Sequence, residues 1–265
     1  MPVDKDARLA ELVECVRGER RTVEACVDMH DLTSVQARGL ERRFAGRTGL
    51  RRVDLSGVET VGEFGMNDVC NGAGSLTTCL LSALTTVGGV NSQGGMARAF
   101  KDCVSITRVG DVEPGIPGKE VGVDLRSLSS VSEGRENGEG GMAECFKGCT
   151  GLVSVELPNL AVVGNRGLGR CFAGDTALVE LSMPKLAHVG NQGLFSMCEG
   201  CTSLEVIDFS EATAVPRISH TTFGDTNPTF KIVVPDALYD EWVAAKHWSD
   251  RAAQIVKASD YKPGR

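Results

Sequence analysis

Hydrophobic and polar positions recur along this chain with a period of 26 residues. In each unit, apolar and polar side chains alternate over a short stretch, which predicts a β-strand. The three clearest strand cores, spaced by 26 residues, are 155–157, 181–183 and 207–209. Before each strand, a Gly-Leu or Gly-Met pair precedes an aromatic or cysteine position, a spacing that favours a turn of helix or 3₁₀ helix. One unit cannot bury its apolar face alone, so the repeat predicts a stack of units with a parallel sheet on one face.

About seven units fill residues 20–229, and the first of them, at 27–35, is partial. One unit is interrupted, because its strand core at 123–125 follows 14 residues later than the repeat requires. We therefore predict an insertion at residues 107–122. Long insertions in surface loops are tolerated at small entropic cost, but an insertion in one unit of a solenoid also often carries binding. Both interpretations are open at this point.

Both ends of the stack are predicted to carry caps, because a stack of units leaves an apolar surface at each end. Residues 1–19 place apolar side chains at helical spacing and predict a capping helix. Residues 230–265 combine a last strand with two helical patterns, for which Asp236 and Ser249 are the predicted N-caps. Trp242 and the other aromatic residues of this segment are interpreted as a plug over the last unit, with an aromatic ligand site as the alternative.

The predicted fold class is an α/β repeat solenoid that forms a single domain over residues 1–265. It is a right-handed superhelix with a parallel β-sheet on one face and short helical or 3₁₀ turns on the other. Helical caps are expected at both ends.

The run F-x-G-C-T-x-L-x-x-V-x-L-P-x-L-x-x-V-G at residues 146–164 resembles the BspA-type leucine-rich repeat. The resemblance extends over about residues 20–235, although the present unit is longer than that family's usual one. The family is similar to bacterial surface adhesins and to proteins of unknown role. The resemblance therefore implies an adhesin-like, non-catalytic module that binds another protein, without identifying that protein. The alternative is a structural component of a cell-surface or phage-tail assembly.

Composition and charge narrow the expected partners. The 265 residues carry a net charge of −7, whereas nucleic-acid binding needs a basic face, so nucleic acid is not expected as a partner. Membrane insertion is not expected either, because no apolar run reaches about 18 residues. The first residues lack the apolar stretch of a secretory signal. We expect a cytoplasmic monomer, unless the chain is a piece of a surface or phage protein.

Ten cysteines raise the question of a metal or redox site, above all the C-x-x-C formed by Cys198 and Cys201. Eight of the ten fall on positions that are apolar in other units, which predicts buried free thiols that bind no metal. Zinc needs further ligands beyond a cysteine pair, and no histidine is near this one in sequence. A disulfide between Cys103 and Cys149 needs an orientation that stacked neighbours rarely provide. No cofactor and no metal ion are predicted.

No catalytic residue is predicted. The four histidines are scattered, and none meets a serine or cysteine in the register of the repeat, which disfavours a hydrolase or thiol enzyme. The glycine-rich run at 164–174 mimics a nucleotide loop. Its glycines recur in every unit, however, so they are predicted to serve turns or close packing.

Two surface features are the candidates for partner binding. The middle residue of each strand core is predicted to point outward, and five of seven such residues are acidic. Since like charges on neighbouring strands are unfavourable, this row serves either solubility and protection of the sheet or a basic partner. The insertion is the second feature. The predicted partner-binding residues are Asp28, Asp54, Asp124, Glu156 and Asp208 on the strands, and Val112, Ile116 and Lys119 in the insertion.

Overall fold

A computed structural model describes residues 25–88, 94–113, 116, 119–132 and 140–262. The predicted N-terminal capping helix at 1–19 lies outside these residues. In the described part of the chain, no helix has the length and apolar character needed to cross a membrane.

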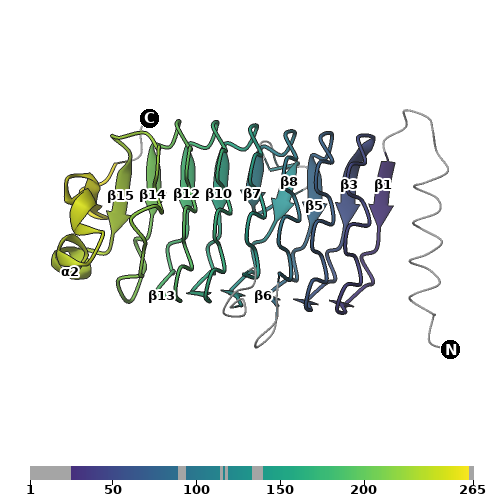
Figure 1. Cartoon of the computed structure of the whole chain (residues 1–265), viewed down its shortest axis with the longest axis horizontal. Coiled ribbons are helices and arrows are strands. Elements are labelled where there is room, and N and C mark those ends of the chain that lie inside the picture. Colours follow the sequence, from purple (N-terminus) through teal and green to yellow (C-terminus); the bar gives the residue numbers. More distant parts are fainter. Residues whose placement is uncertain (1–24, 89–93, 114–115, 117–118, 133–139, 263–265) are drawn as a thin grey trace.

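Two parallel β-sheets run along the molecule, and their strands lie side by side in a coil (Figure 1). Among the described residues, the large sheet has ten strands in the order β1-β3-β5-β8-β7-β10-β12-β14-β15-β16, and the small sheet has six in the order β13-β11-β9-β6-β4-β2. The strands of the large sheet are β1 (Ala25–Asp28), β3 (Leu50–Asp54), β5 (Thr78–Leu80), β7 (Arg108–Gly110), β8 (Gly122–Asp124), β10 (Ser154–Glu156), β12 (Glu180–Ser182), β14 (Val206–Asp208), β15 (Lys231–Val234) and β16 (Ile255–Lys257). Those of the small sheet are β2 (Ser34–Val35), β4 (Thr60–Val61), β6 (Thr86–Val87), β9 (Ser130–Val131), β11 (Val162–Val163) and β13 (His188–Val189). The fold is a repeat solenoid made mostly of parallel sheet, and the handedness of its superhelix stays a prediction.

The strand register confirms the repeat of 26. Val53 pairs with Cys79, and Leu181 pairs with Ile207, so each residue faces its counterpart one unit later. All four of these side chains point inward and are fully buried. The aromatic position of the repeat stacks in the same way, with ring centroids 5.3 Å apart for Phe100 and Phe146. The core therefore consists of rows of equivalent side chains that run along the coil.

The third side of the coil is not helical, and the prediction of helical or 3₁₀ turns there was wrong. Along residues 38–47, every second N–H bonds to the carbonyl three residues earlier, as Glu41 does to Arg38. The intervening N–H groups bond to the next unit, as Arg42 does to Asn67 at 2.9 Å. This face is a chain of overlapping β-turns whose remaining donors link neighbouring units.

A positive φ at every fourth residue produces this chain of turns. In the first unit these residues are Arg38 at 60°, Arg42 at 56° and Gly46 at 68°. The last of the three positions is glycine at 46, 72, 148, 174 and 200, and aspartate at 102 and 225. Glycine populates positive φ without steric cost, and a residue with positive φ ends any right-handed helical turn. The prediction that the recurring glycines serve turns is confirmed at this position.

The interrupted unit contributes an additional strand to the large sheet. β7 stands where the uninterrupted repeat requires a strand, and it pairs with β10. The chain then steps back, and β8 pairs with both β5 and β7. The segment 107–122 is therefore not only a surface insertion. Between β5 and β10 the large sheet holds two strands, whereas β9 alone stands between β6 and β11 in the small sheet.

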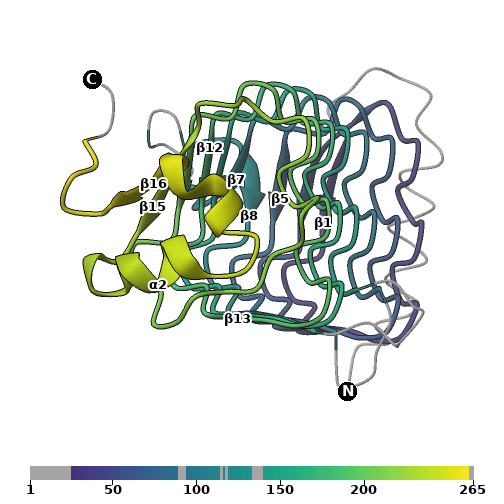
Figure 2. The ribbon, with the colours of Figure 1, turned by 60° about the vertical axis from the view of Figure 1, so that its left-hand side comes forward.

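The C-terminal segment closes the end of the coil (Figure 2). After β15 come η1 (Asp236–Leu238), α2 (Tyr239–Ala244) and η2 (Ser249–Gln254), and β16 then pairs with β15. Trp242 and Trp248 are buried, with ring centroids 5.2 Å and 5.8 Å from that of Phe209. This packing agrees with the interpretation of the aromatic residues as a plug. The predicted N-caps were wrong, because neither η1 nor η2 has a side-chain capping bond.

Candidate functional site

The predicted outward row of the large sheet exists. The register aligns Asp28 with Asp54, Leu80 and Asp124 in the first part of the sheet, and Glu156 with Ser182 and Asp208 in the second. Gly110 of the additional strand stands next to Asp124. The row thus runs along the sheet as predicted, with one more position in its middle.

The four aspartates of this row terminate their own strands. Each carboxylate accepts a hydrogen bond from the backbone N–H two residues later, an arrangement typical of an Asx-turn. The donors are His30 (3.1 Å), Ser56 (3.1 Å), Arg126 (3.2 Å) and Ser210 (2.8 Å). The recurrence of aspartate at this position therefore has a structural cause that is independent of any partner.

Several acids of the row also contact neighbouring basic side chains. Asp28 lies 2.6 Å from the His30 ring, and this hydrogen bond raises the pKa of His30. Arg52 lies 3.3 Å from Asp54, and Arg108 lies 2.9 Å from Glu156. The row as a whole is thus not the open negative face that the sequence suggested.

Asp124 is the clearest correction to the predicted site. Its side chain is 1% exposed and pairs with Arg126 at 2.7 Å. Arg126 also donates to the carbonyl oxygen of Val112 and contacts Asp111, which ties the insertion down onto the outer face of the sheet. Val112 is buried as well. Asp124 and Val112 therefore contribute to folding rather than to a free surface.

The rest of the insertion is partly accessible. Lys119 is held by Asp111 at 3.1 Å, so its charge is compensated within the insertion. Ile116 is 45% exposed, and Val121, which was not among the predicted partner-binding residues, is 42% exposed. Two apolar side chains thus face solvent beside a sheet whose nearby acids are paired.

An uncompensated acidic cluster, formed by Glu180, Glu205 and Asp208, lies further along the sheet. In the described part of the chain, neither Glu180 nor Glu205 forms an ion pair, and both are exposed. Burial and the negative charges of Glu180, Asp208 and Glu205 raise the pKa of Tyr261. Since those charges act on Tyr261, the end of the chain must approach the outer face of β12 and β14. Only Asp208 of this cluster was predicted, because the others do not share its repeat position.

Comparisons with known proteins identify no family for this chain. No family model matches it, and no curated protein matches it. Among solved structures, it is similar to a leucine-rich repeat protein from Bacteroides ovatus ATCC 8483, with 14% identity over 85% of this chain and 69% of that chain, at a TM-score of 0.25. A likeness at this TM-score says nothing about the function of this chain.

The eight cysteines on apolar repeat positions are buried as predicted, including Cys198 and Cys201 of the C-x-x-C, whereas Cys26 is exposed. Cys15 lies outside the described residues. Burial raises the pKa of Cys103 to about 12 and that of Cys198 well above its ordinary value. Three thiols at one repeat position each donate to a backbone carbonyl of the previous unit. These hydrogen bonds, all 3.1 Å long, join Cys103 to Cys70, Cys149 to Phe100 and Cys201 to Phe172. Within the described residues, no group of three or more metal-ligating side chains is assembled. The lack of a metal ion stays a prediction.

Asp175 occupies the same repeat position as these thiols, between Cys149 and Cys201 along the row. Its side chain is 0% exposed and faces the backbone N–H groups of Gly148 and Cys149, which already bond to the carbonyls of Ala173 and Phe146. Burial, reinforced by Cys201, raises the pKa of Asp175 to about 10. The group is therefore a neutral carboxylic acid at physiological pH, set in a row of neutral thiols.

Proposed function

We propose that this chain is a non-catalytic module that binds a basic protein partner on the outer face of the large sheet, between the insertion and Tyr261. The acidic cluster carries the proposal, because Glu180 and Glu205 have no ion pair in the described residues while most acids of the neighbouring row do. Negative charge that the protein does not compensate itself is available to a cationic partner.

The apolar side chains of the insertion supply the second component. Ile116 and Val121 are large, exposed and at the edge of this surface. Protein interfaces combine an apolar centre with a polar rim. The insertion provides apolar contact area, and the acidic cluster provides long-range attraction that guides association.

The buried cysteines are poorly suited to act as catalytic nucleophiles, because burial keeps their thiols protonated. A thiol reacts as the thiolate, and burial raises the pKa of the thiols of Cys70, Cys79, Cys103, Cys145, Cys149, Cys171 and Cys198. This supports a binding role over a thiol enzyme. More specifically, we propose an adhesin-like role, in which the partner lies on another cell or on a matrix surface and the module acts as a monomer.

Affinity capture with matched baits tests the proposal. The baits are the wild-type chain, a Glu180→Gln/Glu205→Gln variant and a control Glu199→Gln/Glu241→Gln variant with the same change of charge at exposed positions elsewhere. We expect the wild type and the control variant to capture the same basic proteins, and we expect the Glu180→Gln/Glu205→Gln variant not to capture them. Binding should also weaken as ionic strength rises above about 0.15 M, where the screening length falls below roughly 8 Å. Equal capture by all three baits would place the binding surface elsewhere.

A further inference from the structure

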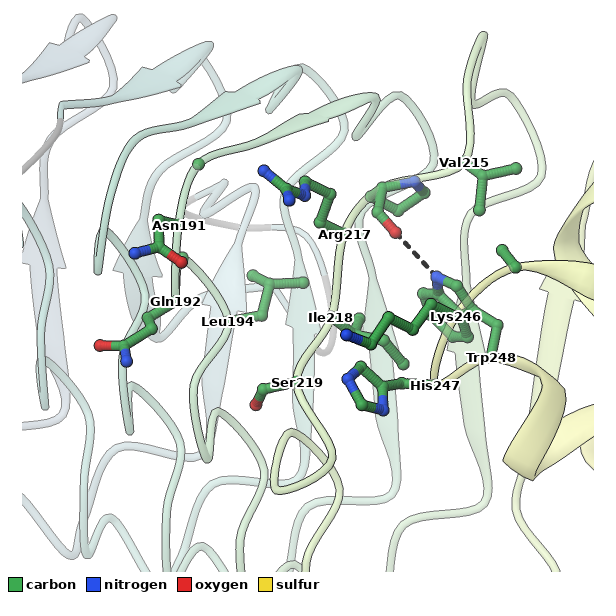
Figure 3. Close-up of a pocket in the computed structure, with 14 residues that line it drawn as sticks. Asn191, Gln192, Leu194, Val215, Arg217, Ile218, Ser219, Lys246, His247 and Trp248 are labelled. Atoms are coloured by element: carbon green, nitrogen blue, oxygen red, sulfur yellow. Dashed lines mark hydrogen bonds between the residues drawn. The ribbon is translucent and has the colours of Figure 1, made fainter.

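A pocket of about 400 Å³ opens at the C-terminal end of the coil, away from the outer face of the large sheet. Three segments line it: the turn at 190–194, the stretch at 215–219 and the loop at 245–248 (Figure 3). Its volume lies within the usual range for small-molecule sites, roughly 300–1,000 Å³. The pocket is therefore a separate candidate from the surface proposed above, and it does not depend on that proposal.

The apolar wall of the pocket is well fixed. Leu194 and Trp248 are each 1% exposed, and Ile218 lies between them in the view of Figure 3. The indole N–H of Trp248 donates to the carbonyl oxygen of Pro216 at 2.7 Å, in a buried hydrogen bond. This bond fastens the C-terminal loop to the 215–219 stretch, so the wall is formed before any ligand arrives.

Positive charge gathers at the same place. Arg217, Lys246 and His247 line the pocket, and no aspartate or glutamate is among its lining residues. In the described part of the chain, Arg217 and Lys246 form no ion pair, and the carboxylate nearest His247 belongs to Asp250, 3.8 Å away and 71% exposed. Arg217 and Lys246 are exposed, and their positive charges line one pocket of a protein whose net charge is −7. An anion in the pocket would supply the counter-charge that the lining lacks.

The backbone at His247 adds an independent observation. Its φ is 67°, and unlike the left-handed residues of the turn face, it does not belong to the repeat. A non-glycine residue in this region costs roughly 1–3 kcal/mol, and such residues concentrate at functional sites. The conformation brings the His247 ring to 6.1 Å from that of His220, next to the cations.

We propose that this pocket binds a small amphipathic anion. A carboxylate or phosphate group would lie near Arg217 and Lys246, where charge-assisted hydrogen bonds are available, and the His247 ring would offer a further hydrogen bond. The apolar body of the ligand would pack on the partly exposed Val215, Ile218 and Ala245, which the buried Leu194 and Trp248 support from beneath. Polar side chains at the rim, Asn191, Gln192 and Ser219, would contact its remaining polar atoms.

Titration of the full chain with simple probes tests this assignment, with calorimetry and the combined fluorescence of Trp242 and Trp248 as readouts. Phenyl phosphate and benzoate present the two anionic groups on the same apolar body, whereas inorganic phosphate lacks the body and benzyl alcohol lacks the charge. We expect at least one of the two aromatic anions to bind saturably, and at least tenfold more tightly than inorganic phosphate or benzyl alcohol. The preferred anion distinguishes a phosphate from a carboxylate site.

Variants of exposed cations complete the test, because they leave the core intact. Arg217→Ala and Lys246→Ala should each weaken binding of the preferred anion about tenfold or more, whereas Arg43→Ala, an exposed cation on the turn face, should leave it unchanged. Equal melting temperatures of all variants would exclude loss of fold as the cause. The assignment is overturned if neither aromatic anion saturates, if benzyl alcohol binds as tightly as the anions, or if the three variants bind alike.

Discussion

Replacement of Asp175 by cysteine is expected to stabilise the protein at neutral pH. Asp175 is fully buried, and the backbone N–H groups of Gly148 and Cys149 beside it are already bonded to other carbonyls. A cysteine would restore the residue type found one unit before, at Cys149, and one unit after, at Cys201. Both of those thiols donate to a backbone carbonyl at 3.1 Å. The substituted thiol is expected to do the same towards the preceding unit.

The magnitude follows from the proton that Asp175 holds in the folded state. Its pKa rises from an ordinary 3.8 to about 10 on folding, so between these pH values the unfolded chain releases a proton that the folded chain keeps. Each pH unit in that window then lowers the free energy of unfolding by about 1.4 kcal/mol. The stabilising effect is complete below pH 3.8 and is lost as the pH rises towards about 10. At pH 7 the accumulated loss is on the order of 4 kcal/mol.

Chemical unfolding of the wild type and of Asp175→Cys between about pH 5 and pH 8 measures this effect. The difference in unfolding free energy should widen by about 1.4 kcal/mol per pH unit. Asp175→Asn should abolish the same pH dependence but gain less stability, because a buried amide also needs hydrogen-bond partners. Glu199→Gln, which changes an exposed carboxylate, should follow the wild type. Parallel curves for the wild type and Asp175→Cys would refute the argument that Asp175 is protonated in the folded state.

Three further predictions follow from the coil and its end. Gly174→Ala should destabilise the protein by about 1 kcal/mol in thermal unfolding, because φ is 80° at this position. Gly49 is equally free of close contacts but has no positive φ, so Gly49→Ala should be neutral or stabilising. Arg126→Ala should lower the free energy of unfolding by about 3 kcal/mol, because it leaves the carboxylate of Asp124 buried without its cation. It should also make the insertion susceptible to limited proteolysis. Unchanged stability and cleavage would show that Arg126 does not fasten the insertion. Trp242→Ala should lower the free energy of unfolding by about 3–5 kcal/mol. Deletion of residues 236–265 should cause aggregation, which light scattering detects. A truncated chain that stays monomeric with an unchanged melting temperature would contradict the interpretation of this segment as a plug.

The strands could be predicted from sequence because inward positions repeat faithfully. Val53, Cys79 and Leu181 fill equivalent places, so period and strand location follow from burial alone. The turn face could not be predicted, because an apolar residue every fourth position suits a helix as well as a chain of β-turns. Glycine at a fixed position, as at Gly46 and Gly174, was the available signal for positive φ.

The candidate sites were less predictable, because they depend on how distant segments meet. The acidic row was located correctly from the sequence. Its role in ending the strands became clear only from hydrogen bonds such as that from the Ser56 N–H to the Asp54 carboxylate. The burial of Asp124 depends on Arg126 and the insertion. The acidic cluster gains Tyr261 from the end of the chain, and the pocket combines a turn near Leu194 with a loop more than 50 residues later. No local sequence pattern predicts that these distant segments lie next to each other.

The backward step from β7 to β8 constrains the order in which the coil can assemble. Elsewhere in a repeat array, each new unit adds to the one made just before it, so ordered structure can spread in chain order. β7 has no contact with β5 in the sheet, since β8 lies between them and comes later in the chain. During synthesis, β7 must therefore wait unpaired until residues 122–124 have been inserted beside β5. The turn face does not share this break, because the N–H groups of Met66 and Cys70 bond directly to the carbonyls of Gly95 and Ala99. The delay in assembly is therefore expected only on the side of the coil that carries the large sheet.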